Sequence, residues 1–365
     1  MIDLSTDKLK APANRRSFLR RGLIASTATL GAGLLASKTG LAERGMRGPT
    51  RGDIAILRLL AAAELIEADL WQQYAELGGV SSGTQNPYQL ALQNLDSDGS
   101  QYISSNTLDE QSHAAFLNAY LQSVGATPVN LDQFRTLPSS QATGAQQIGR
   151  LTNLTQLTVD TSWYTRYRSQ TNPDFEATFA PALPALSAGK FTGIPRSNSD
   201  MTNADQIQAI ANTAAFHFGF IEQGGTSLYA TLSQKVSHPE VLKITLGIGG
   251  DEICHFLEWV DFSGNAVQPP VAPVTDPATG LTFPNFDATP NPLLQTNLIF
   301  PVPCEFISPK LPMCAVIRPT SSGQIDAVGA IESFIADGLF IGQPQEFINM
   351  LLNLAQLADA AEREI

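Results

Sequence analysis

Glu110-Gln111-Ser112-His113 and Glu252-Ile253-Cys254-His255 carry the same Glu-x-x-His pattern at two separate places in the chain. In an α-helix, residues three apart lie on one face, so each stretch directs a carboxylate and an imidazole into the same space. A single Glu-x-x-His arises by chance in many helices. The repetition is more informative, because the chain has only 4 histidines and two of them lie in these stretches.

A lone glutamate, followed seven residues later by a tyrosine, precedes each of these stretches. Glu67 and Tyr74 come before the first stretch, and Glu222 and Tyr229 come before the second. A duplicated helical hairpin would produce this order of lone Glu and Glu-x-x-His. Four such helices can surround two metal ions with four glutamates and two histidines, which is the ligand set of dimetal-carboxylate helix bundles.

Apolar periodicity predicts four long helices, at residues 53–77, 107–124, 204–234 and 239–262. Glu64 and Glu67 both fall on the apolar stripe of the first helix. A buried carboxylate is costly unless it is paired, protonated or bound to a cation. The stripe therefore predicts a cation or a polar partner inside the bundle.

Four side chains near this pattern have alternative interpretations. Thr107-Leu108-Asp109-Glu110 is a capping box, in which Glu110 would bond the start of a helix instead of a metal. The matching second stretch favours ligation. Tyr74 and Tyr229 either donate hydrogen bonds around the metals or fill the core. Cys254 is expected to be a small core residue and not a ligand.

The remaining segments suggest a crossover and a C-terminal extension. Residues 128–203 form a long connection, in which a short helix is expected at residues 147–167. Residues 268–319 are rich in proline, and two further helices are predicted at residues 325–340 and 344–363. We expect the region 265–365 either to cover the bundle or to make a subunit contact in a homo-oligomer.

Residues 1–42 resemble a bacterial twin-arginine signal peptide. Asn14-Arg15-Arg16-Ser17-Phe18-Leu19-Arg20 is similar to the twin-arginine motif, a short apolar run follows it, and Gly40-Leu41-Ala42 offers a cleavage point. The segment predicts export to the periplasm or the cell exterior through that machinery, which carries folded proteins with their cofactors already inserted. A membrane anchor or a disordered tail is the alternative.

Charge limits the partners of this chain of 365 residues. Without the 7 basic and 2 acidic residues of the first 42, it carries 15 Lys/Arg and 32 Asp/Glu, a net charge of −17. Nucleic acid is excluded as an expected partner, because phosphate binding requires a basic surface. Cations are favoured. A hydrophobic fraction of 43% with 15% charged residues indicates a globular protein.

The four predicted helices, residues 53–262, resemble the ferritin-like superfamily, and in particular exported bacterial proteins related to plant desiccation-related proteins. Glu67-x6-Tyr74 is similar to the first helix of bacterioferritin, ferritin and rubrerythrin, so by this match Glu67, not Glu64, is the lone glutamate. The resemblance implies an all-α ferritin-like four-helix bundle with a long crossover between helices two and three. The crossover and the Pro-rich and helical extension argue against a ferritin cage.

The resemblance implies six metal ligands: Glu67, Glu110, His113, Glu222, Glu252 and His255. Two divalent ions would neutralise four carboxylates and leave both histidines neutral. This donor set suits iron or manganese, and we expect iron ahead of manganese. Such a centre would oxidise Fe(II) with oxygen or peroxide, or consume peroxide. The alternatives are a manganese-catalase-like enzyme and a non-catalytic structural or stress-protective protein whose metals hold the bundle together.

Overall fold

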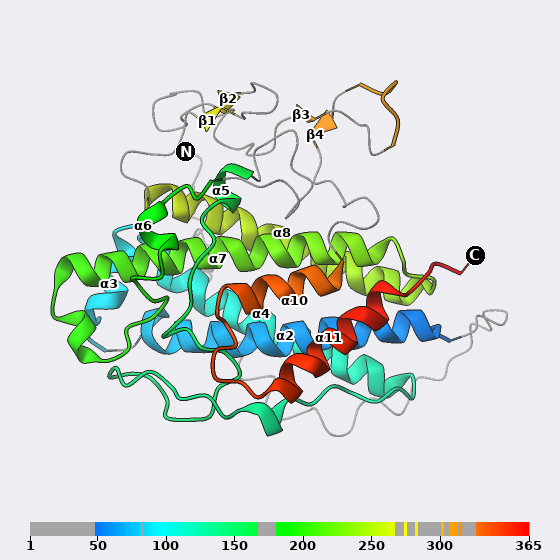
Figure 1. Ribbon diagram of the computed structural model, residues 1–365, viewed down its shortest axis with the longest axis horizontal. Helices are drawn as coiled ribbons and strands as arrows, with labels where there is room; N and C mark the ends of the chain where they lie inside the picture. The colour runs from blue at the N-terminus through cyan, green and yellow to red at the C-terminus, as the bar shows by residue number, and fades with distance from the viewer. Residues whose placement is uncertain are drawn as a thin grey trace, which may run out of the picture. The chain divides into compact units, whose positions relative to one another are not determined.

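The computed structural model describes residues 48–81, 83–166, 180–266, 307–312 and 326–364, together with four two-residue strands. Four long helices form its centre: α2 (Arg51–Gly78), α4 (Gly99–Ser123), α7 (Ala204–Ser233) and α8 (Pro239–Asn265). α2 packs against α4 and α7 packs against α8, so two helical hairpins lie side by side (Figure 1). The predicted all-α four-helix bundle with a long crossover is confirmed.

Shorter elements occupy the connections and the C-terminal region. The short helices of the first half and the crossover are α3 (Pro87–Gln93), η1 (Asp132–Phe134), α5 (Trp163–Arg166), α6 (Pro184–Ser187) and η2 (Asn198–Met201). Two antiparallel strand pairs follow α8, formed by β1 (Val274–Thr275) with β2 (Thr282–Phe283) and by β3 (Pro301–Val302) with β4 (Cys314–Ala315). The final helices are α10 (Ala327–Ala336) and α11 (Gln345–Asp359).

Side chains cap the beginning of α2. Thr50 and Asp53 form a capping box at the start of α2, with Asp53 N donating to Thr50 Oγ1 at 3.1 Å. The carboxylate of Asp53 also accepts a hydrogen bond from Ser237 N at 2.9 Å. One side chain thereby joins the beginning of α2 to the turn between α7 and α8.

Helix α4 begins eight residues before the predicted start at Thr107, and this removes the capping interpretation of Glu110. Thr107 lies in the middle of α4, and its hydroxyl donates to the carbonyl oxygens of Ile103 and Trp71 at 2.7 and 3.1 Å. A residue inside a helix cannot cap it. Glu110 is therefore available for the interior of the bundle.

The predicted helix at residues 147–167 is wrong, apart from the short α5. Leu151, Leu154 and Leu157 are buried, but the backbone donors of this stretch reach distant partners. Leu151 N donates to Asp69 Oδ2 at 3.0 Å, and Thr158 N donates to the carbonyl oxygen of Asp337 at 2.7 Å. The three-residue leucine spacing thus reflects packing on the bundle and not helical turns.

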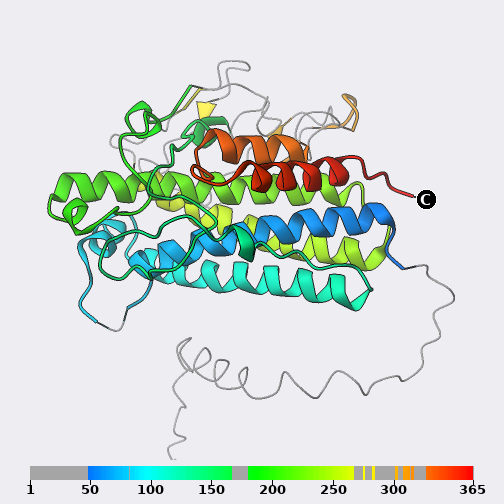
Figure 2. The ribbon, with the colours of Figure 1, turned by 60° about the horizontal axis from the view of Figure 1, so that its bottom comes forward.

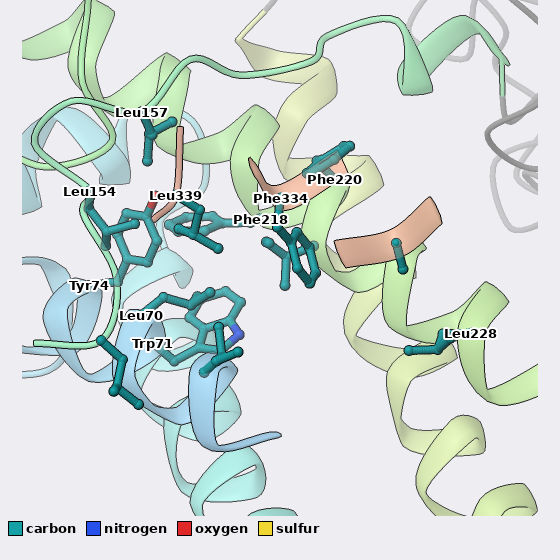
Figure 3. Close-up of a cluster of buried hydrophobic side chains, with 14 of the residues drawn as sticks. Leu70, Trp71, Tyr74, Leu154, Leu157, Phe218, Phe220, Leu228, Phe334 and Leu339 are labelled. Carbon is teal, nitrogen blue, oxygen red and sulfur yellow. The ribbon is translucent and has the colours of Figure 1, made fainter. Parts of the chain in front are cut away.

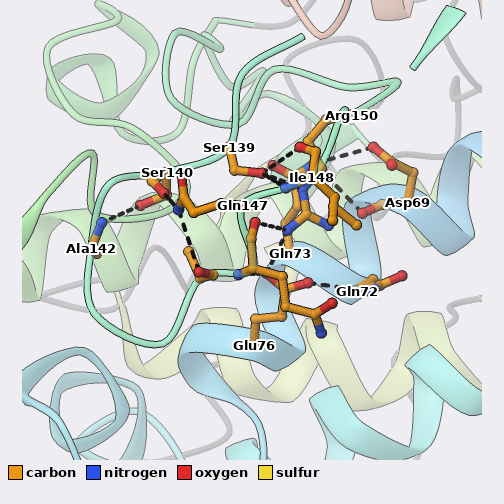
Figure 4. A network of polar contacts seen from close by, with 12 residues as sticks. Asp69, Gln72, Gln73, Glu76, Ser139, Ser140, Ala142, Gln147, Ile148 and Arg150 are labelled. Carbon is orange, nitrogen blue, oxygen red and sulfur yellow. Dashed lines mark hydrogen bonds and ion pairs between the residues drawn. The ribbon is translucent and has the colours of Figure 1, made fainter. Parts of the chain in front are cut away.

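Two buried carboxylates of α2 anchor this crossover, and both are paired with arginine (Figure 4). Asp69 accepts from Arg135 Nη1 at 2.7 Å, and Glu76 accepts from Arg150 Nη2 at 2.5 Å. Gln73, between them on the helix, donates to Thr152 Oγ1 at 2.8 Å. Away from the centre of the bundle, buried acidic side chains are therefore neutralised by protein partners.

Aromatic side chains fill the core beside the crossover (Figure 3). Trp71 of α2 stacks on Phe218 of α7 and on Trp259 of α8, with ring centroids 4.9 and 5.3 Å apart. Leu154 and Leu157 lie beside Tyr74 in the same cluster. This aromatic packing joins three of the four long helices, α2, α7 and α8.

The C-terminal helices cover one side of the bundle. In Figures 1 and 2, α10 lies along α7 and α11 lies along α2. The two predicted helices of this region are thus confirmed, as is its contact with the bundle, whereas the subunit contact stays a prediction. The signal segment 1–42 and most of the Pro-rich segment lie outside the described residues. Among the helices described, none has the length and apolar character needed to cross a membrane.

Candidate metal centre

Acidic and histidine side chains from all four long helices converge inside the bundle. Each is at most 8% exposed. They are Glu64 and Glu67 on α2, Glu110 and His113 on α4, Glu222 on α7, and Glu252 and His255 on α8. The six residues predicted as ligands are thus all buried inside the bundle, and Glu64 is an additional member.

His113 lies at the centre of the first group of potential ligands. Its Nδ1 atom is 3.3 Å from Glu110 Oε2, 3.4 Å from Glu64 Oε2 and 3.8 Å from Glu252 Oε1. One donor atom from each of these four residues falls within a sphere suited to a single cation, since all lie within 4.8 Å of one another. Three carboxylates and one imidazole form a donor set that iron and manganese accept.

His255 lies at the centre of a second group. Its Nδ1 atom is 3.1 Å from Glu110 Oε1 and 3.3 Å from Glu222 Oε2. Glu110 therefore turns one oxygen toward each histidine, and it is the only residue common to the two buried groups in the described part of the chain. A carboxylate in this position can bridge two cations.

The donor atoms of this cluster lack the partners that buried polar atoms normally have. Among the residues described, Glu64 Oε2, Glu110 Oε1, Glu222 Oε2 and both carboxylate oxygens of Glu252 accept no hydrogen bond, nor is His255 Nδ1 hydrogen-bonded. No lysine or arginine of the described chain pairs with these glutamates, in contrast to Asp69 and Glu76. Acceptor atoms that face one another without donors must be protonated or bound to cations. The residues present therefore fit divalent metal ions.

Two hydrogen bonds cross between the hairpins and relate Glu64 to Glu222. The hydroxyl of Tyr229 on α7 donates to Glu64 Oε1 on α2, and Trp71 Nε1 on α2 donates to Glu222 Oε1 on α7 at 3.0 Å. Each aromatic donor follows a glutamate of its own helix by seven residues. In this arrangement Glu64-x6-Trp71 corresponds to Glu222-x6-Tyr229.

The sequence pattern had paired Glu67 with Tyr74 instead, one helical turn further along α2. In the structure the Tyr74 hydroxyl is 2.7 Å from His217 Nδ1 and bonds no glutamate. Glu67 is buried beside the cluster but belongs to neither group of close donor atoms. Its assignment as a ligand stays a prediction. The indole N–H of Trp71 can take the place of a tyrosine hydroxyl as a hydrogen-bond donor. The spacing Glu64-x6-Trp71 was therefore the sequence signal that could have identified Glu64.

Two aspartates that the sequence analysis did not identify contact the Nε2 atoms of the two histidines, which are the outer nitrogens. His113 Nε2 is 3.2 Å from Asp251 Oδ2, and His255 Nε2 is 3.4 Å from Asp109 Oδ2. Each aspartate directly precedes the glutamate of one Glu-x-x-His stretch and contacts the histidine of the other. A carboxylate on Nε2 keeps the proton there and leaves Nδ1 free for a metal. The repeated Asp-Glu-x-x-His sequence was the signal that could have identified both aspartates.

Burial and mutual repulsion keep protons in this cluster. Burial, and then the charge of Glu64, raises the pKa of Glu110 to about 8. Burial, and then Glu110, raises the pKa of Glu252 well above its usual range. For His113, burial works in the opposite direction, but the nearby carboxylates of Glu110 and Glu64 raise the pKa to about 10. Divalent cations can displace these protons and supply the missing positive charge.

The remaining histidine and cysteine near the cluster are not placed as ligands. Burial lowers the pKa of His217 to about 3, so this histidine is neutral and serves Tyr74. Cys254 was expected in the core, but it is exposed on the outer face of α8. The helix position explains this error, because Cys254 lies between Glu252 and His255 and points away from the face they share.

Comparison with known proteins gives one match. The family model described as a ferritin-like domain matches residues 52–261, which contain all four long helices and every residue of the cluster. No curated protein and no solved structure matches the chain. The matched region ends before the strands, α10 and α11.

Proposed function

This chain belongs to the ferritin-like domain family, and from that premise we propose that it is a dimetal-carboxylate protein that oxidises Fe(II) with oxygen or peroxide. The observation that supports the proposal most directly is the buried cluster of donor atoms without protein partners. The residues of this cluster would hold two iron ions, which would supply the redox chemistry for the oxidant.

We propose six metal ligands, which are all the residues of the cluster except Glu67: Glu64, Glu110, His113, Glu222, Glu252 and His255. Four carboxylates and two divalent ions have no net charge when both histidines are neutral. Glu67 would be a fifth carboxylate. Burial, and then Glu64, raises the pKa of Glu67 well above its usual range, so a protonated, neutral Glu67 preserves the balance.

The surrounding side chains hold the ligands in place. Asp251 and Asp109 face the N–H groups at the outer nitrogens of the two histidines, which fixes the orientation of each ring. Tyr229 and Trp71 each donate to one oxygen of a lone glutamate and leave its other oxygen for the interior. Stacked aromatic rings at one end of the cluster exclude water.

Iron is the proposed metal, and manganese is its competitor. The test is to load purified, metal-free protein with Fe(II) or with Mn(II) and to follow the consumption of oxygen and of peroxide. Oxidation of Fe(II) that depends on oxygen or peroxide supports the proposal. Rapid decomposition of peroxide by the manganese form would favour a catalase-like enzyme. Tightly bound metal with no turnover of either oxidant would favour a structural role and contradict the proposal.

We also propose that the protein is exported by the twin-arginine route. The support is the sequence of residues 1–42 alone. Replacing Arg15 and Arg16 together by lysine should retain the protein in the cytoplasm, while a Lys8→Arg variant outside the motif should be exported normally. Cell fractionation measures both. Equal export of the two variants would contradict this assignment.

A further inference from the structure

We propose that a small apolar pocket between α2, α7 and α10 is the site through which a small, neutral, apolar oxidant, dioxygen in the proposed reaction, reaches the metal centre. This inference rests on the proposed function for the identity of the oxidant. The pocket itself is independent of it. Glu67 from α2, Gly225 and Leu228 from α7, and Phe334 from α10 are among its lining residues.

The wall of the pocket is almost entirely apolar. Phe220 and Leu228 line it from α7, and Phe334 lines it from α10. Glu67 and Ser333 supply its only polar side chains. A hydrated ion would lose water there without gaining enough polar contacts, whereas a small apolar molecule loses nothing.

The inner end of the pocket adjoins the metal-binding cluster. Gly225 lines the pocket, and a Cβ atom built on it would lie 2.0 Å from Glu252 Oε2. Only glycine backbone therefore separates the pocket from this carboxylate, and neither oxygen of Glu252 has a hydrogen-bond partner among the described residues. Glu67, one helical turn from Glu64, forms the other part of the same end.

The two lone-glutamate helices differ at one position beside the pocket. Glu67 lies three residues after Glu64, and Gly225 lies three residues after Glu222. A side chain at position 225 would collide with Glu252, whose carboxylate fills the space beside the glycine. The glycine therefore lets Glu252 approach the wall of the pocket. α10 lies outside the region that the family shares, so this chain's own extension completes the pocket.

The test uses xenon, which enters apolar cavities, on the full metal-free chain, and oxygen dependence on the iron-loaded chain. Ser333→Leu should fill the pocket from α10, and Ala336→Leu, at an exposed position of the same helix, is the matched control. We expect xenon between Glu67 and Phe334 in the parent chain and in Ala336→Leu, but not in Ser333→Leu. In the iron-loaded Ser333→Leu protein, the KM for oxygen should rise about tenfold with unchanged iron content.

Two outcomes would overturn the inference. One is the absence of xenon from this pocket in the parent chain. The other is a Ser333→Leu protein that excludes xenon but keeps the parent KM for oxygen. Xenon binding in a chain that takes up no metal would support the pocket and contradict the proposed function, so the failures of the two proposals are distinguishable.

Discussion

The two hairpins of the bundle, α2 with α4 and α7 with α8, supply the same ligands but different surroundings. Each gives one lone glutamate and one Asp-Glu-x-x-His stretch, and each sends an aromatic donor and an aspartate across to the other hairpin. The first hairpin has Trp71 and Glu67 where the second has Tyr229 and Gly225. The common residues form the proposed site for two cations, and the differences change the side chains on either side of it.

This comparison explains why neither hairpin would hold a metal by itself. The donor atoms around His113 come from α2, α4 and α8, and those around His255 come from α4, α7 and α8. Each group therefore includes ligands of both hairpins. Metal binding should couple the two halves, because a cation stabilises only the state in which they are packed together.

The largest effect is expected at the residue that the two groups share. Glu110→Gln removes one charged donor from both groups, so we expect the loss of both ions and a fall in affinity of more than about 100-fold, beyond the range for residues that only support a ligand. Glu64→Gln should affect the ion near His113 first, and Glu222→Gln the ion near His255. Elemental analysis of loaded protein measures the number of ions bound to each variant. Two ions retained by Glu110→Gln would contradict the role of Glu110 as a residue shared by both groups.

A smaller effect is expected where the hairpins differ most. Gly225→Ala places a methyl group against Glu252 Oε2, and such overpacking should lower the free energy of unfolding by about 1–3 kcal/mol. Gly250→Ala on α8 is the matched control, because nothing lies within 4 Å of its Cβ position. That change should stabilise the helix by about 0.5–1 kcal/mol. Chemical denaturation measures the free energy of unfolding of both variants. Equal effects of the two changes would contradict the close approach of Gly225 to Glu252.

The pH dependence of stability should have opposite signs with and without metal. In the metal-free chain, the pKa of Glu110 is raised from 4.5 to about 8 and that of His113 from 6.5 to about 10. Stability from a raised pKa is complete below the unfolded value and is lost as pH rises through the folded value. The melting temperature should therefore fall between pH 6.5 and about 8.

In the loaded chain, metal competes with these protons, so the melting temperature should rise over the same pH range. Calorimetry of both forms measures the two slopes. Glu110→Gln should weaken the slope of the metal-free protein. Slopes of the same sign in the two forms would show that the cluster does not exchange protons for metal.

The smallest effects are expected from the two crossed aromatic donors. Trp71→Phe and Tyr229→Phe each remove one hydrogen bond to a lone glutamate, and each should weaken metal binding about tenfold. Tyr74→Phe, which loses only the bond to His217, is the control. Titration calorimetry measures the affinities. A strong effect of Tyr74→Phe with none of Tyr229→Phe would favour Glu67 over Glu64 as the ligand.

The helices and the helix faces that carry the proposed ligands were predictable because they depend on local spacing. Apolar periodicity and the three-residue Glu-His interval are properties of one helix at a time. The choice between Glu64 and Glu67 as the ligand could not be made from spacing within one helix. Both lie on the buried stripe of α2, and they are distinguished by contacts from other helices, which are the bond from Tyr229 and the approach of His113 to Glu64.

The errors have the same origin in long-range contacts. Leu151, Leu154 and Leu157 have helical spacing, but their segment bonds to α2 and to the residues after α10. The partners of Asp109 and Asp251 lie on opposite hairpins, and α10 closes the pocket from the far end of the chain. Such features depend on which elements meet in space, and no spacing within one segment records that.

Anomalous diffraction from crystals of the full chain loaded with iron tests the central claim most directly. We predict two iron peaks inside the bundle, both beside Glu110, one held by Glu64 and His113 and the other by Glu222 and His255. Iron bound only at surface carboxylates, or no iron between the four helices, would contradict the account.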